Sequence, residues 1–121
     1  MTTIEIIFPF PPSANTAYPT NARGARHLSK RGKAFKDEAG WIALEALRAI
    51  AGAQCITLDI ALWFPNKRAS DVDNYIKLPK DVICEALHID DDFTRVPRVV
   101  VEYRGIDKAH PRCVVTVNRL T

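Results

Sequence analysis

The chain has 121 residues, of which 47% are hydrophobic and 26% charged, and its formal net charge is +3. This length suits one compact domain, so we expect a single domain over residues 1–121. No run of eighteen apolar residues is present to span a membrane, and the first residues lack a signal-peptide pattern. We therefore expect a cytoplasmic protein without a membrane partner.

The cysteines are few and widely spaced. Cys55, Cys84 and Cys113 are odd in number and suit neither a disulfide framework nor a zinc site. We expect them to be buried thiols in a reducing compartment.

Periodicity first predicts a short strand at residues 3–8, which is rich in β-branched side chains and is stopped by Pro9. Residues 13–28 carry Ser, Asn, Thr, Pro and Gly and are expected to form a loop. Ser29 is a plausible N-cap for a long helix that ends near Gly52. The apolar residues at steps of three and four, which predict its buried face, are Phe35, Ala39, Ile42, Ala46 and Ile50.

The second half of the chain begins with a clear strand at residues 55–64, where apolar and other residues alternate. A helix is expected over much of residues 74–87, with Pro79 in its first turn or bending it. Two more strands are expected at 99–104 and 112–120. This β-α-β-α-β-β order predicts an α+β or α/β domain with a mixed sheet of about four strands and two main helices. The aromatic residues expected in its core or at a subunit interface are Phe35, Trp41, Trp63 and Phe64.

One segment of the chain is strongly basic. Residues 21–36 hold no acid, and their side chains that could contact phosphate are Arg23, Arg26, His27, Lys30, Arg31, Lys33 and Lys36. Such a segment gains from nucleic acid by releasing condensed counterions. The alternative is a solvated loop and helix start.

Carboxylates form two clusters that flank the second helix. Asp71 and Asp73 follow the clearest strand, and the run Asp90, Asp91 and Asp92 follows the helix. Side chains two residues apart in extended backbone project to the same side, so the first two carboxylates could meet one ion. If the helix begins by Asp73, Lys77 would share its face.

Oxygen ligands without nearby cysteine or histidine suit magnesium, which typically binds one or two protein carboxylates together with waters and a substrate phosphate. Such an ion can activate water for phosphodiester hydrolysis, and a nearby lysine can stabilise charge on the phosphate. Lys67 and Arg68, just before the acids, would offset their repulsion of DNA. The alternative is that the acids are only a helix cap and an exposed turn.

At this point the chain resembles a known family. Asp71-Val72-Asp73-Asn74-Tyr75-Ile76-Lys77 with the later Asp91-Asp92 is similar to the D-x-D-N-x-x-K…D-D signature of RusA-type Holliday-junction resolvases. The opening Phe8-Pro9-Phe10-Pro11-Pro12-Ser13 with Asn15, and the segment from Ser29 to Asp37, resemble the same family. The likeness covers nearly the whole chain.

The resemblance implies a magnesium-dependent endodeoxyribonuclease that acts on four-way DNA junctions in recombination and repair, with Mn2+ as a possible substitute. It implies that Asp71, Asp73 and Asp92 are catalytic metal ligands and that Lys77 is the catalytic lysine. Asp91 is the adjacent acid of the pair and an alternative ligand, because Asp90 makes the register uncertain. Asn74 would orient the loop. The side chains expected to contact DNA are Asn15, Arg23, Arg26, His27, Lys30, Arg31, Lys33, Lys67 and Arg68.

The family also implies a homodimer, because two opposed nicks resolve a junction of approximate two-fold symmetry. Branched DNA is the expected substrate, and no small-molecule substrate is expected. Two further hypotheses remain open: a DNA-binding module without catalysis, and a metal nuclease for other branched or single-stranded DNA.

Overall fold

A computed structural model describes residues 2–20 and 23–120. The elements run in the order β1 (Thr3–Pro9), α1 (Ala14–Ala17), α2 (Lys30–Ala46), η1 (Leu47–Ile50), β2 (Ile56–Phe64), η2 (Val72–Tyr75), α3 (Lys77–Leu87), β3 (Arg98–Ile106) and β4 (Arg112–Arg119). This small α+β arrangement, with a mixed four-stranded sheet and two main helices, confirms the predicted fold class. No helix in the described ranges is long and apolar enough to cross a membrane.

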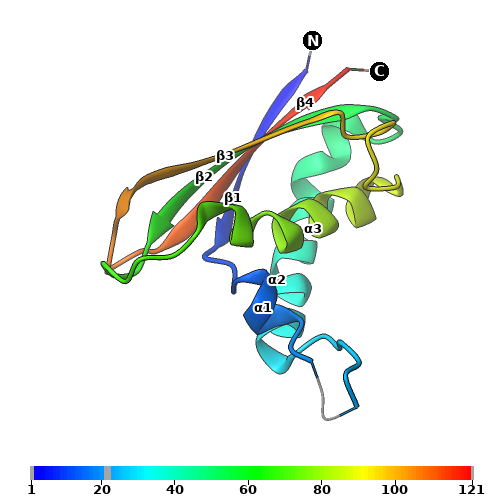
Figure 1. Cartoon of the computed structure of the whole chain (residues 1–121). Helices are drawn as coiled ribbons and strands as arrows, with labels where there is room; N and C mark the ends of the chain where they lie inside the picture. Colours follow the sequence, from blue (N-terminus) through cyan, green and yellow to red (C-terminus); the bar gives the residue numbers. More distant parts are fainter. Residues whose placement is uncertain (1, 21–22, 121) are drawn as a thin grey trace.

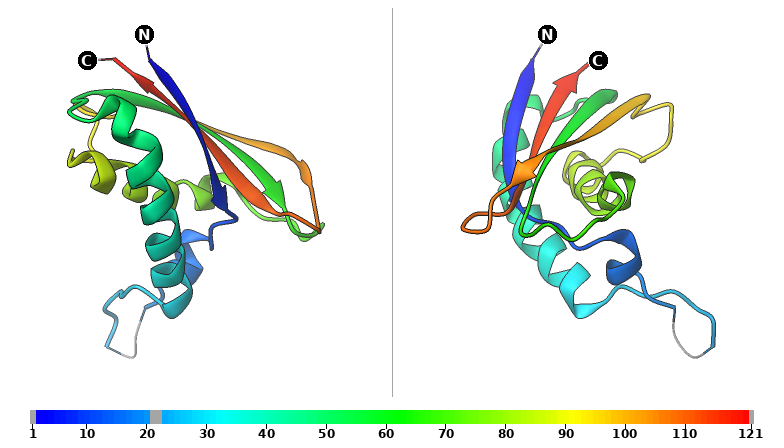
Figure 2. Two further views of the ribbon diagram at one scale, coloured as in Figure 1. Left: turned by 180° about the vertical axis from the view of Figure 1, so that it is seen from behind. Right: turned by 60° about the vertical axis from the view of Figure 1, so that its left-hand side comes forward.

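The sheet has the strand order β1-β4-β2-β3. β4 pairs antiparallel with both β1 and β2, whereas β3 pairs parallel with β2. A parallel pair needs a crossover, and α3 with η2 supplies it here. The helices pack on one face of the sheet and leave the other face uncovered by any helix (Figures 1 and 2).

The core lies between this sheet and the helices. β2 presents alternate apolar residues to it, from Ile56 through Phe64, all 7% exposed or less. On α2, Phe35 and Ala39 are buried as predicted, but Ala43 is buried more completely than the expected Ile42 and Ala46. In η1, Leu47 and the expected Ile50 are buried. The buried stripe is therefore shifted slightly around the helix.

The aromatic side chains divide into two groups. Phe35 and Phe64 are buried as expected, and Phe35 packs edge-on against Phe8 with ring centroids 6.0 Å apart. Trp63 is half-buried, with the Arg112 guanidinium 4.2 Å from its ring. Trp41 is 76% exposed, so of the two places expected for it, the core is excluded and a subunit interface stays a prediction.

The start of α2 is fixed as the sequence predicted. The Ser29 side chain accepts a hydrogen bond from the backbone N–H of Gly32 at 3.1 Å. Gly32 lies where α2 approaches α1, since an added Cβ would lie 3.2 Å from Ala17 and 2.7 Å from Leu28. Because glycine has no Cβ, α1 can pack closely against α2 here. The Pro-rich segment that joins β1 to α1 therefore lies beside α2.

The cysteines of the described chain are all free thiols, with Cys84 and Cys113 buried and Cys55 half-buried. Burial raises the pKa of Cys84 to about 11 and that of Cys113 to about 12. These two thiols therefore stay protonated near neutral pH, which agrees with the structural role expected for them.

Candidate active site

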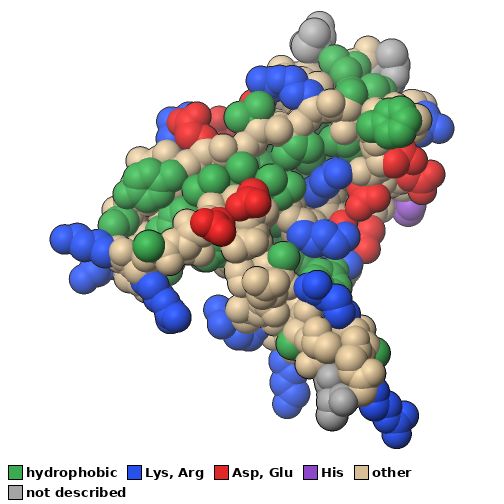
Figure 3. Space-filling model, viewed as in Figure 1, with side chains coloured by type: hydrophobic (Ala, Val, Ile, Leu, Met, Phe, Trp, Pro, Cys, Tyr) green, Lys and Arg blue, Asp and Glu red, His purple; other side chains and the backbone are tan. Residues whose placement is uncertain are grey.

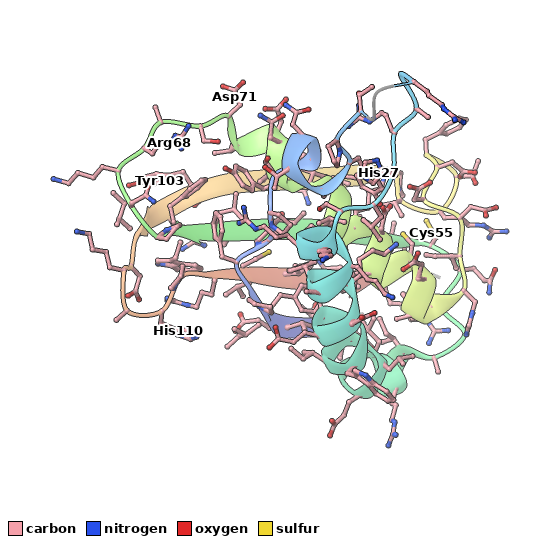
Figure 4. All side chains as sticks on the ribbon, turned by 90° about the horizontal axis from the view of Figure 1, so that it is seen from below. His27, Cys55, Arg68, Asp71, Tyr103 and His110 are labelled. Carbon is pink, nitrogen blue, oxygen red and sulfur yellow. The ribbon has the colours of Figure 1, made fainter. Side chains whose placement is uncertain are left out.

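The first acidic cluster lies at the carboxyl end of β2, where the chain leaves the sheet. Asp71 has extended backbone and precedes the short 3-10 turn η2, and its carbonyl accepts a hydrogen bond from the Asn74 backbone N–H at 3.1 Å. Figure 4 shows Asp71 pointing outward from the loop that also carries Arg68. The Asp71 and Asp73 side chains are exposed and have no hydrogen bond or ion pair with any described residue. They are available to an exogenous ligand.

Three aromatic rings anchor the loop that carries Asp71 and Asp73, called the acidic loop below. Tyr75 packs against Phe10 and Phe64 with ring centroids 5.3 Å and 5.2 Å away, and Phe10 and Phe64 are 4.9 Å apart. The Tyr75 hydroxyl is 2.7 Å from the Ser70 Oγ. Phe10, Phe64 and Tyr75, the aromatic anchor, thus join the end of β1, the end of β2 and the loop. Tyr75 therefore anchors the loop that carries Asp71 and Asp73.

Lys77 is the first residue of α3 and faces the second acidic cluster. Its Nζ lies 3.1 Å from the Asp81 Oδ2 and 3.9 Å from the Asp91 Oδ2. The expected helical pairing of Asp73 with Lys77 does not form, because α3 begins only at Lys77 and Asp73 lies in the preceding 3-10 turn. Pro79 occupies the first turn of α3, where its missing N–H costs no helical hydrogen bond, so it need not displace the lysine.

The lysine remains charged in this setting. Burial lowers the pKa of Lys77, but the hydrogen bond to Asp81 and the charges of Asp81 and Asp91 outweigh it and raise that pKa above 10.5. A fixed ammonium beside carboxylates can stabilise developing negative charge on a phosphate.

Asp91 and Asp92 differ in their contacts. The Asp92 side chain accepts hydrogen bonds from the Thr94 hydroxyl and, at 2.9 Å, from the Thr94 backbone N–H. These bonds and the Asp92 carbonyl's bonds to the N–H groups of Arg95 and Val96 stabilise the loop before β3. The Thr94 hydrogen bonds lower the pKa of Asp92. Asp91 is therefore the acid of this pair that faces Lys77.

The donor chemistry of the site fits a hard divalent cation, because Asp71 and Asp73 offer unpartnered carboxylate oxygens and Asp91 lies beside the lysine. The described residues nevertheless contain no group of three acidic, histidine or cysteine side chains close enough to hold one ion. Figure 3 shows acidic side chains in separate groups on one face of the molecule, with basic side chains between some of them.

Basic residues from separate segments approach the acidic loop. A cleft of about 430 Å³ is lined by Arg31 from α2, Arg68 from the loop after β2, and the Pro11-Pro12-Ser13 segment. Arg68 is exposed, and its backbone N–H is held at 2.9 Å by the Asn66 side chain. The cleft adjoins Ser70, just before Asp71. The structure thus brings together three segments that the sequence had separated by tens of residues.

The described part of the basic segment before α2 projects away from the sheet (Figure 1). The exposed basic side chains of the whole segment are Arg23, Arg26, His27, Lys30, Arg31 and Lys33, and His27 lies in the loop between α1 and α2 (Figure 4). Residues 21 and 22 lie outside the described ranges. Asn15 is exposed on α1, and Lys67 is exposed beside Arg68. Lys36 instead makes an ion pair with Glu85 at 2.8 Å.

Comparison with known proteins assigns the family. Residues 9–118 match the family model described as endodeoxyribonuclease RusA. The chain belongs to the RusA family. It is 35% identical over 106 residues to the crossover junction endodeoxyribonuclease RusA of Escherichia coli strain K12, and 34% identical over 106 residues to that of Enterobacteria phage 82. Each alignment covers 88% of this chain and 83% of the relative. Membership of this endodeoxyribonuclease family confirms the predicted enzyme class.

Two contacts of the candidate site were not predicted from the sequence. Asp81 contacts Lys77, and Tyr18 contacts Asp81 with its hydroxyl at 3.3 Å. The four-residue spacing from Lys77 to Asp81 could have indicated the first contact, because such residues are neighbours on a helix. The second contact joins residues 63 positions apart and needs the fold.

Proposed function

We propose that this chain is a resolvase that nicks four-way DNA junctions in recombination and repair, acting on DNA in the cytoplasm as a single domain. The observation that carries the proposal is the acidic loop, which presents two unpartnered carboxylates beside a basic cleft and is followed by Lys77 facing Asp91. The RusA relatives, which are named crossover junction endodeoxyribonucleases, supply the substrate class.

In this proposal a magnesium ion would be held by Asp71 and Asp73, with Asp91 or Asp92 coming closer to them than in this structure to complete the site. When bound, it supplies a polarised phosphoryl oxygen and a water of lowered pKa. Lys77 places its ammonium where negative charge develops on the phosphate. Arg31 and Arg68 bind the DNA backbone at the cleft, and the aromatic anchor keeps the acidic loop in place at the end of β2.

The proposal includes a homodimer. A four-way junction has approximate two-fold symmetry, and its resolution needs a nick in each of two opposed strands. One chain has one acidic loop and can cut one strand at a time. A closed dimer would present two such loops related by the same symmetry as the substrate.

A substrate panel tests this function against its alternatives. Purified protein is incubated with a labelled four-way junction, a flap, a fork and a linear duplex of the same sequence, with magnesium. Paired nicks in the junction alone support the resolvase. Preferred cutting of flaps or forks would favour a nuclease for other branched DNA. Tight junction binding with no cut in any substrate would favour a binding module.

A further inference from the structure

We propose that Asp81, held by Tyr18, is a positioning residue that fixes the ammonium of Lys77 for cleavage. This inference rests on the proposed nuclease function and adds to it a residue outside the acidic loop. The Lys77 Nζ donates a hydrogen bond to the Asp81 Oδ1 at 3.2 Å and lies 3.1 Å from the Asp81 Oδ2, so the contact restrains the direction of the lysine as well as its distance.

Asp81 is the less accessible partner of this pair. Its side chain is 12% exposed, whereas those of Lys77 and Asp91 are 51% and 50% exposed. The carboxylate therefore lies beneath the lysine, away from the surface where DNA would arrive. Lys77 is therefore the residue that contacts the substrate, and Asp81 acts through Lys77.

Tyr18 completes the arrangement from the other side of the fold. Its hydroxyl donates to the Asp81 Oδ2 at 3.3 Å, and the Lys77 Nζ lies 5.9 Å from the centre of its ring. Tyr18 is the C-cap of α1, so it links the Pro-rich segment after β1 to α3. A free lysine side chain samples many rotamers, so removing either Asp81 or Tyr18 would let the ammonium move away from Asp91.

The neighbouring ion pair gives a matched control. Glu85 lies four residues after Asp81 on α3 and pairs with Lys36 at 2.8 Å, but it does not contact Lys77. Asp81→Asn and Glu85→Gln each remove one carboxylate charge from the same helix. A purely structural role for Asp81 would make the two variants alike in cleavage.

The experiment is single-turnover cleavage of a four-way junction with magnesium, together with junction affinity measured with calcium in its place. Asp81→Asn is expected to slow cleavage roughly 10- to 100-fold with affinity and Tm nearly unchanged, because misplacing a catalytic group acts on the rate. Asp81→Glu should recover part of that loss. Tyr18→Phe should slow cleavage roughly 2- to 10-fold. Glu85→Gln should cleave at the wild-type rate.

A double-mutant cycle shows whether Asp81 acts through the lysine. Adding Asp81→Asn to Lys77→Met should slow cleavage no further than Lys77→Met alone, because groups acting as a unit are not additive. A full additional loss in the double variant would overturn the inference. So would an Asp81→Asn enzyme that cleaves at the wild-type rate.

A second measurement does not depend on activity. Side-chain carbon relaxation in lysine-labelled protein should show Lys77 more ordered than the exposed Lys33, and Asp81→Asn should remove that difference. Unchanged order of Lys77 in Asp81→Asn would contradict the positioning role. If the wild type cleaves nothing, the proposed function fails, and this measurement still decides whether Asp81 holds the lysine.

Discussion

Asp91 and Asp92 are adjacent in the chain but have different partners. Asp91 lies 3.9 Å from the Lys77 ammonium, whereas the Asp92 carboxylate is occupied by Thr94 in the loop before β3. The resemblance to the family left the choice between them open. Their contacts favour Asp91 as the acid that completes the site and Asp92 as the residue that holds the loop.

Asparagine substitutions separate the two roles. Asp91→Asn is expected to lower junction cleavage roughly 100-fold while leaving Tm unchanged, because a metal ligand supplies several kcal/mol to the transition state. Asp92→Asn is expected to lower Tm, because its charge-assisted hydrogen bonds to Thr94 are weakened. Cleavage assays and thermal unfolding of both variants check this. An active Asp91→Asn beside an inactive Asp92→Asn of normal Tm would reverse the assignment.

Asp107 provides a test of stability outside the acidic loop. Its carboxylate accepts hydrogen bonds from the His110 backbone N–H at 3.0 Å and from Arg112 at 2.9 Å, and these hold the pKa of Asp107 below 3.8. Because the folded-state pKa is depressed, the stabilisation is present above the unfolded pKa and is lost as the pH falls through the folded value.

The expected result is that Asp107→Asn has a lower Tm than the wild type at pH 7. The difference should shrink as the pH falls below about 4 and vanish once the carboxylate is protonated in both states. Thermal unfolding at a series of pH values measures it. A Tm difference that stays constant down to pH 2 would show that the charge is not the cause.

At the residue scale, the motif names candidate site residues but not their contacts. The motif singles out Asp71, Asp73 and Lys77 from local spacing, and the later acid as Asp92 or its neighbour Asp91. The partnership of Lys77 with Asp81 was missed although both lie in the predicted helix at a spacing of four residues. The contact of Tyr18 with Asp81 could not be predicted, because only the packing of α1 against the remaining helices brings them together.

At the element scale, the end of α3 has a strained position. His88 caps the helix with φ 57° and ψ 43°, a left-handed conformation that favours glycine. His88→Gly is expected to stabilise the fold by about 0.5–1 kcal/mol, measured by urea unfolding. His88→Ala is the control, because alanine keeps the Cβ and should give no such gain. Equal stability of the two variants would contradict the account.

The helices and strands were predictable where buried residues recur at one regular spacing along the chain. The alternation in β2 gave both its boundaries and its buried face, because one side of the sheet is covered and the other is not. The break between η2 and α3 was not foreseen. The short turn is held in place by the aromatic anchor, a tertiary contact that propensity does not include.

At the scale of the whole molecule, the basic segment is expected to set the salt dependence of DNA binding. Arg26 and Lys30 are exposed where the loop enters α2. The double variant Arg26→Ala with Lys30→Ala should weaken binding to junction and duplex alike. It should also reduce the slope of log affinity against log salt by about 2, because each side chain would neutralise one DNA phosphate. An unchanged slope would show that these two side chains do not contact DNA phosphates.

The strand order could not be read from the sequence. The turn between β3 and β4 is short, yet β2 lies between them because β3 joins it as a parallel partner at the sheet edge. The parallel pairing becomes understandable only once α3 is seen to cross over between β2 and β3. That crossover places the acidic loop at the carboxyl end of β2 and turns the chain back from Lys77 to Asp91.

The most direct test of the central claim is cleavage of a labelled four-way junction by wild type, Asp73→Asn and Glu85→Gln, each with magnesium and with a chelator. We predict symmetric paired nicks by the wild type and Glu85→Gln with magnesium only. Asp73→Asn should bind the junction but cleave it at least roughly 100-fold more slowly. Undiminished cleavage by Asp73→Asn, or cleavage that persists with the chelator, would contradict the proposed site.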